Sequence, residues 1–155
     1  MAEPVRPTLA ASAAVFRGPL VLLAQRGYAP GKGLWSLPGG RVEPGETLAE
    51  AAAREVMEEV RVEAEMIGLA AALDFISRDA EGVLTSHFVV AAHAALWRSG
   101  EPMIGDEAVA VGWFHPDEVA SLATTHGLAD VVHRAARLLS VEAPQCAAPW
   151  AHAGS

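Results

Sequence analysis

The sequence GRVEPGETLAEAAAREVMEEVRV spans Gly40 to Val62 and contains six glutamates. It overlaps a Pro38-Gly39-Gly40 segment, which predicts a tight turn because glycine adopts backbone conformations closed to other residues. Carboxylates gathered behind such a turn concentrate negative oxygens, and a hard cation is the usual way to balance them. We therefore expect this stretch to carry the function and the rest of the chain to hold it in place.

The second half of the stretch has the pattern of an amphipathic helix. Thr47 is suited to be its N-cap, and Glu50 three residues later completes a capping-box pattern. Apolar side chains recur every fourth residue, at Leu48, Ala52, Val56 and Val60. These patterns predict a helix from Thr47 to about Val60 that packs this apolar face on a core.

Three glutamates of the predicted helix share one side. At about 100° per residue, Glu55, Glu58 and Glu59 project within an arc of roughly 100°. Oxygen ligands without a nearby Cys or His favour Mg²⁺ or Mn²⁺ over zinc, and protein-bound Mg²⁺ usually works with substrate phosphates. A phosphate-linked substrate is the first hypothesis. The alternative is a solvated acidic helix face in a purely structural domain, which would show no Mg²⁺-dependent change in stability.

Strand-like runs flank the helix on both sides. They cover residues 8–16, 19–26, 35–37, 64–77, 83–97 and 108–114. A short helix is expected to begin at His115-Pro116-Asp117, and a final amphipathic helix to cover 128–139. The alanine content of 64–77 and 83–97 keeps a helical alternative open there. This order predicts an α+β or α/β sandwich with a mixed sheet between helices.

Composition and charge narrow the class of protein. The 155 residues fit one compact domain, expected over residues 1–140, with a flexible tail over 141–155. The net charge of −8 weighs against a nucleic-acid or anionic-membrane surface. Cys146 is the only cysteine, so an intrachain disulfide is excluded and a reducing compartment is favoured. No signal peptide and no apolar run of ~20 residues is present, which makes a cytoplasmic location the default expectation.

The stretch from Gly40 to Val62 resembles the signature box of Nudix hydrolases, G-x5-E-x7-R-E-U-x-E-E-x-G-U, where U is an aliphatic residue. The matching positions are Gly40, Glu46, Arg54, Glu55, Val56, Glu58, Glu59 and Val62. The preceding segment, Leu34 to Gly39, is also similar to the family's approach to the box. The resemblance implies a Nudix-like α/β/α sandwich with a mixed sheet, and divalent-metal-dependent hydrolysis of a diphosphate linkage.

Arg61 is the one departure from the box, since it stands where the family has glycine. That glycine suits a left-handed helix C-cap, a conformation that disfavours arginine by about 1 kcal/mol. Either the helix continues past this point or its end is strained. We expect Arg61 to alter stability more than chemistry.

The resemblance also implies roles for the box residues. Glu55, Glu58 and Glu59 would bind the divalent ions, Mg²⁺ or Mn²⁺, and the Gly40 carbonyl would be a further ligand. Glu46 and Arg54 would form an ion pair that braces the loop against the helix.

A general base must take the proton from the attacking water. Glu58 is the first candidate, because it lies on the metal-facing arc and cationic surroundings would keep it deprotonated. Glu107 is the second, because many family members place a functional glutamate in the corresponding loop. An ordinary exposed loop acid explains Glu107 equally well.

Residues outside the box must decide the substrate. Arg26, Tyr28 and Arg78 are candidates for its pocket, since a nucleotide needs a stacking surface and a cation, although surface loops explain them equally well. His87 and His93 lack the spacing of metal ligands and are expected to be structural or exposed.

The substrate class itself remains open at this stage. The lead is ADP-ribose or a nucleotide sugar, ahead of a nucleoside triphosphate pyrophosphatase that would release a nucleoside monophosphate and pyrophosphate. A nucleotide-binding sensor without catalysis is a further alternative, although such a module would be expected to lose box glutamates. The apolar content allows a homodimer, and no residue compels one.

Overall fold

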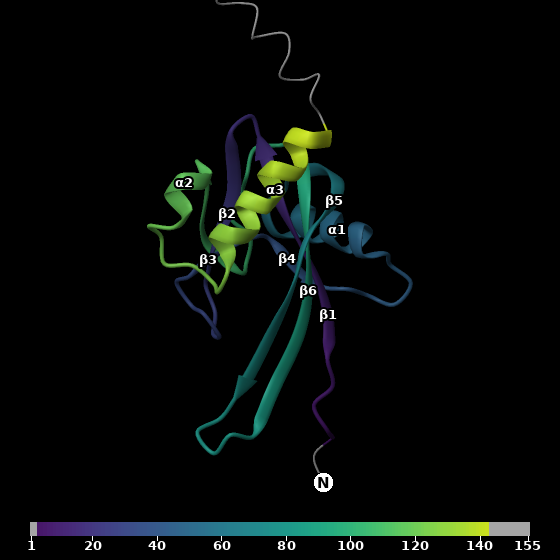
Figure 1. Cartoon of the computed structure of the whole chain (residues 1–155), viewed down its shortest axis with the longest axis vertical. Coiled ribbons are helices and arrows are strands. Elements are labelled where there is room, and N and C mark those ends of the chain that lie inside the picture. Colours follow the sequence, from purple (N-terminus) through teal and green to yellow (C-terminus); the bar gives the residue numbers. More distant parts are fainter. Residues whose placement is uncertain (1–2, 143–155) are drawn as a thin grey trace, which may run out of the picture.

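The structure is a computed structural model that describes residues 3–142. Its strands are β1 (Thr8–Arg17), β2 (Leu20–Arg26), β3 (Trp35–Ser36), β4 (Gly39–Arg41), β5 (Glu63–Arg78), β6 (Leu84–Ser99) and β7 (Ala108–Phe114). Its helices are α1 (Leu48–Val60), α2 (Pro116–Val119) and α3 (Leu128–Glu142). These elements form one mixed sheet between helices, so the predicted fold class is confirmed (Figure 1).

The sheet has the strand order β3-β2-β1-β6-β5, with β4 also paired to β1 and β7 to β2. The β1–β6 pair is parallel, whereas the other strand pairs are antiparallel. The sequence predicted the hairpin of β1 and β2 and the bounds of β7, because both depend on local apolar runs and turn residues. The parallel pairing of β1 with β6 joins segments far apart in the chain and has no local signal.

The alternation of side chains along β1 divides the interior into two cores. Successive residues of a strand point to opposite faces. Ala11, Ala13 and Val15 therefore pack with α1, while Ala14 and Phe16 face α2 and α3. One helix layer covers each face of the sheet.

Helix α1 begins as the sequence predicts and buries a slightly different face. The Thr47 hydroxyl accepts a hydrogen bond from the Glu50 N–H at 3.1 Å, while within residues 3–142 the return bond of a capping box is not formed. The fully buried positions are Ala51, Ala52, Val56 and Val60. Leu48 is 38% exposed, so its predicted place in the core was wrong; as the first residue of the helix it lies at the edge of the packed face.

The Pro38-Gly39-Gly40 segment is not the predicted tight turn. Gly39 and Gly40 lie in β4, where they pair with Ser12 and Ala11 of β1. A Cβ atom built on Gly39 would lie 2.5 Å from the Ala11 carbonyl oxygen. Glycine is therefore required here for close approach between strands and not for a turn.

Strands β5 and β6 form a hairpin of two 16-residue strands that projects beyond the helices (Figure 1). The helical alternative for this region is wrong, because β6 is paired with β1 on one edge and with β5 on the other, and its small alanine side chains pack on both faces of the sheet. Helix α3 continues past the predicted end to Glu142. The rest of the predicted tail, including Cys146, lies outside the described residues. Within residues 3–142, no helix combines the length and the apolar character that a bilayer crossing requires.

Candidate active site

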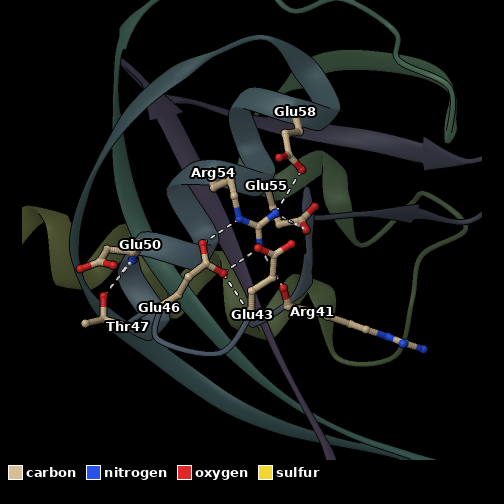
Figure 2. A network of polar contacts seen from close by, with 8 residues as sticks. All are labelled: Arg41, Glu43, Glu46, Thr47, Glu50, Arg54, Glu55 and Glu58. Carbon is tan, nitrogen blue, oxygen red and sulfur yellow. Dashed lines mark hydrogen bonds and ion pairs between the residues drawn. The ribbon is translucent and has the colours of Figure 1, made fainter.

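Arg54 is the centre of a network that joins the loop after β4 to α1 (Figure 2). Its Nε and Nη2 atoms donate to the two carboxylate oxygens of Glu46, at 2.7 and 2.9 Å. Nη1 donates to Glu55 at 2.9 Å and to Glu58 at 3.1 Å, and Nη2 also donates to the Arg41 carbonyl at 3.0 Å. This bidentate pairing fixes the loop relative to the helix with a geometry that arginine alone supplies.

The Arg54–Glu46 contact also sets the charge of Glu46. The hydrogen bond from Arg54, with a further one from the Glu43 N–H, lowers the pKa of Glu46 to about 2. Glu46 is therefore ionised throughout the neutral range. The structure thus contains the ion pair that the box implies.

Glu55 lies directly against β4. A Cβ atom on Gly40 would come within 2.5 Å of the Glu55 carboxyl group, so only glycine leaves room for it. Burial raises the pKa of Glu55, while the hydrogen bond from Arg54 opposes this rise. The carboxyl group of Glu55 is held close to the backbone of the strand.

Glu59 points into a cavity of about 190 Å³. The Gly39 N–H donates to its carboxylate at 3.0 Å. Burial is the main cause that raises the pKa of Glu59 to about 7, and the negative charges of Glu107 and Glu55 raise it further. The hydrogen bond from Gly39 acts in the opposite direction. Glu59 is the strongly perturbed acid of this site, which marks it as a functional candidate.

The Glu107 loop is tied to the loop after β2, which brings Glu107 to the same cavity. The Gly27 N–H donates to the Glu107 carbonyl at 2.9 Å, and the Tyr28 hydroxyl donates to the Asp106 carbonyl at 3.1 Å. The cavity is lined by Arg26, Tyr28, Ser36, Leu37, Gly39, Glu59 and Glu107. The end of β2, the β3–β4 segment, α1 and the loop before β7 therefore meet at one pocket that contains two glutamates.

The structure brings some of the predicted site residues together and leaves others apart. Glu55, Glu59 and Glu107 lie within electrostatic reach of one another, and Arg26 and Tyr28 line the same pocket. The Glu58 side chain is 61% exposed and turned toward Arg54, so the expected convergence of all three helix glutamates is not formed.

Arg78 lies at the end of β5, where its guanidinium donates to the Gly82 carbonyl at 3.2 Å. It lines neither this pocket nor the adjoining groove. The role of Arg78 in substrate binding therefore stays a prediction, and its place at the end of β5 lies in the projecting hairpin. His93 is buried, with Nδ1 3.1 Å from the Ser12 carbonyl oxygen, which agrees with the structural role expected of it.

Sequence reasoning missed Ser36 and Leu37, which line the pocket, and the Gly39 N–H, which binds Glu59. Their position immediately before the box was the available signal. Ser36 belongs to the two-residue strand β3, and its sequence does not show which side chain faces the pocket. The pairing of β3 with β2 sets that orientation.

A family model of the NUDIX domain matches residues 6–135. The chain belongs to the Nudix family. It is thus a Nudix hydrolase, an enzyme of the pyrophosphohydrolase class that acts on nucleoside diphosphate derivatives.

Three relatives illustrate the range of similarity. An ADP-ribose pyrophosphatase of Methanocaldococcus jannaschii is 31% identical over 123 residues, which cover 79% of this chain and 70% of that protein. A putative 8-oxo-dGTP diphosphatase of Bacillus subtilis is 56% identical over 39 residues, 25% of this chain and 24% of that protein. The crystal structure of a MutT NUDIX hydrolase from Burkholderia pseudomallei has a TM-score of 0.71 and 32% identity, covering 83% of this chain and 98% of that one.

Nudix hydrolases generally use divalent metal ions, and the donor chemistry of this pocket fits such an ion. Within residues 3–142, no three acidic, histidine or cysteine side chains already surround a point where an ion would sit. Besides burial, the negative charge of Glu107 raises the pKa values of Glu55 and Glu59, and a bound cation would remove this repulsion. The oxygen-only donor set suits a hard cation.

Proposed function

We propose that this Nudix hydrolase cleaves the diphosphate linkage of a nucleoside diphosphate joined to another moiety, with ADP-ribose or a nucleotide sugar as the lead substrate. The meeting of Glu59 and Glu107 in a pocket that also contains Arg26, with Glu55 within electrostatic reach of both, carries the proposal. The similarity over most of the chain to a protein named ADP-ribose pyrophosphatase supports the substrate.

Mg²⁺ is the proposed cofactor, with Mn²⁺ as the alternative. Glu55 and Glu59 would hold the ion together with the Gly40 carbonyl, and Glu58 would join them by leaving Arg54. When bound, the ion polarises phosphate oxygens and stabilises the negative charge that develops during cleavage.

The other side chains would position and activate the reactants. Arg26 would contact phosphate oxygens, and Tyr28 would close the pocket beside it. The Arg54–Glu46 pair would keep Glu55 against β4. Glu58 and Glu107 remain the two candidates for the base that accepts the proton of water, because Glu58 is paired with Arg54 beside the metal-facing side of α1 and Glu107 lines the pocket.

The test is incubation with ADP-ribose, nucleotide sugars and nucleoside triphosphates in Mg²⁺, comparing the protein with its Glu58→Gln and Glu107→Gln variants. Loss of the general base lowers kcat by about 10²- to 10⁴-fold, and the two variants differ if only one residue has this role. Hydrolysis of ADP-ribose or a sugar nucleotide in preference to triphosphates is the expected result. Hydrolysis of none of these compounds would contradict the proposal.

A nucleoside triphosphate pyrophosphatase that releases a nucleoside monophosphate and pyrophosphate is the second candidate. The strong local identity to a putative 8-oxo-dGTP diphosphatase favours it. Preferential release of pyrophosphate from triphosphates would select it. Tight binding of a nucleotide without turnover would instead indicate a sensor, which the retention of every box glutamate argues against.

A further inference from the structure

We propose, on the basis of the diphosphate cleavage proposed above, that Tyr28 is a positioning residue whose hydroxyl holds Glu107 in the pocket that Glu59 also lines. Glu107 ends the loop between β6 and β7, residues 100–107, which we call the strap. One part of the strap contacts the end of α1, and its other end contacts the loop after β2. The placement of Glu107 relative to Glu59 is therefore set by contacts made outside the reacting groups.

The first contact joins the strap to the C-terminal end of α1. The Met103 N–H donates to the Val60 carbonyl at 3.0 Å. This carbonyl is one of the last four of the helix, which have no partner within the helix itself. A Cβ atom on Gly105 would lie 2.8 Å from the Glu59 carbonyl oxygen, so glycine lets the strap lie directly on the helix backbone. The strap thus touches the backbone of the residue whose carboxyl group enters the pocket.

The second contact joins the strap to the loop after β2. The Gly27 N–H donates to the Glu107 carbonyl at 2.9 Å, and the Tyr28 hydroxyl donates to the Asp106 carbonyl at 3.1 Å. Two successive carbonyls of the strap are therefore bonded just before β7 begins. Asp106 and Glu107 are both exposed, so burial does little to hold this end, and the hydrogen bonds to its backbone matter more.

These bonds oppose a repulsion between like charges. Besides burial, the negative charge of Glu107 raises the pKa of Glu59, so the two carboxyl groups repel one another. Glu107 would reduce the repulsion by moving outward with its end of the strap, and the Tyr28 hydroxyl holds that end in place. Misplacement of a reacting group by about 1 Å can lower a rate about 100-fold. A hydrogen bond to the strap can therefore control kcat.

The ring and the hydroxyl of Tyr28 have separable roles. The residue lines the pocket, where its ring closes the site beside the substrate, while its hydroxyl is bonded to the strap. Tyr28→Phe keeps the ring and removes only the hydroxyl. A residue that acts through Glu107 should also lose its effect once Glu107 no longer functions, because the two changes then interrupt the same interaction.

The test is a double-mutant cycle on kcat and KM in Mg²⁺, with ADP-ribose, nucleotide sugars and nucleoside triphosphates as substrates. It compares the unsubstituted protein with Tyr28→Phe, Glu107→Gln and the variant that carries both changes. Ile104→Ala is the matched control, because its side chain is 55% exposed in the same strap. Thermal unfolding of each variant shows whether it is folded.

We expect Tyr28→Phe to lower kcat about tenfold while KM changes less than twofold, because the substrate still binds and Glu107 is misplaced. Ile104→Ala should leave both constants unchanged. In the Glu107→Gln background, Tyr28→Phe should change kcat less than twofold, so the two losses should not multiply.

Three results would overturn the inference while the proposed activity stands. The first is an unchanged kcat in Tyr28→Phe. The second is a full multiplication of the Tyr28→Phe and Glu107→Gln losses, which would show that the two residues act independently. The third is a rise in KM at constant kcat, which would assign the hydroxyl to substrate binding. Absence of turnover by the unsubstituted protein would instead refute the proposed function, and the role of Tyr28 would fall with it.

Discussion

Arg61 is the residue at which this chain departs from the box of its family. It has φ 61° and ψ 30°, the left-handed conformation, and its N–H donates to the Met57 carbonyl at 3.0 Å. The helix therefore ends at Val60, and of the two predicted outcomes the strained end is the one observed. A residue with a Cβ atom adopts this conformation at a cost in free energy, which the surrounding structure must offset.

The substitution Arg61→Gly should raise the free energy of unfolding by about 1 kcal/mol, because glycine adopts the left-handed conformation without strain. For a chain of this size the midpoint of thermal unfolding should rise by roughly 3 °C. Arg61→Ala is the control, since it removes the side chain and keeps the strain. A large gain in metal affinity in Arg61→Gly would contradict a role confined to stability.

At the scale of elements, β4 connects the fold to the site. The strand contains two adjacent glycines, Gly39 and Gly40, and each leaves space for a different neighbour. A Cβ atom on Gly39 would meet the backbone of β1, while one on Gly40 would meet the carboxyl group of Glu55. The backbone of β1 cannot move as easily as the end of the Glu55 side chain. A larger residue should therefore be tolerated less well at Gly39 than at Gly40.

Gly39→Ala should therefore destabilise the fold, with a loss of about 2 kcal/mol or more from the strand pairing it displaces. Gly40→Ala should reduce the stability less and instead displace Glu55, which weakens Mg²⁺ binding. Chemical unfolding and metal titration of the two variants measure both effects. Equal losses of stability with unchanged metal affinity would show that Gly40 has no separate role in the site.

At the scale of the whole molecule, the fold places like charges together. Glu55 and Glu59 come from α1, and Glu107 comes from the loop before β7, so only the packed sheet brings these charges within reach of one another. The pKa of Glu59 is raised from its ordinary value of 4.5 to about 7. The folded protein therefore binds a proton there more tightly than the unfolded chain does.

The stability of the metal-free protein should fall as the pH rises from about 4.5 to about 7, because over this range the unfolded chain has released the proton that folded Glu59 still holds. Glu59→Gln removes this cost, so it should raise the unfolding temperature in EDTA clearly at pH 8 and little at pH 5. Mg²⁺ should raise the unfolding temperature of the unsubstituted protein at pH 8. The idea fails if Glu59→Gln has the same effect at both pH values.

Much of the fold could be predicted because its signals are local. The Thr47 cap, the apolar face of α1 and the hairpin turn between β1 and β2 each depend on a few neighbouring residues. The predicted ion pair of Glu46 and Arg54 is present as well, since both lie in one loop and helix. The predictions were wrong where burial or strand pairing in the folded protein sets the local structure. Leu48 is exposed instead of buried, and Gly39 and Gly40 lie in strand β4 instead of a tight turn.

The family, the helix that carries the glutamates and their spacing along it all follow from local patterns in the sequence. Only the tertiary structure decided which carboxyl groups meet, since it turns Glu58 toward Arg54 and adds Glu107 to Glu59. It also places residues of the β5–β6 hairpin along a second cavity, of about 480 Å³, that shares Arg26 and Gly39 with the carboxylate pocket. The physical reason is that hydrophobic periodicity and capping act over a few residues, whereas burial, close approach and repulsion between charges depend on segments that are distant in the chain.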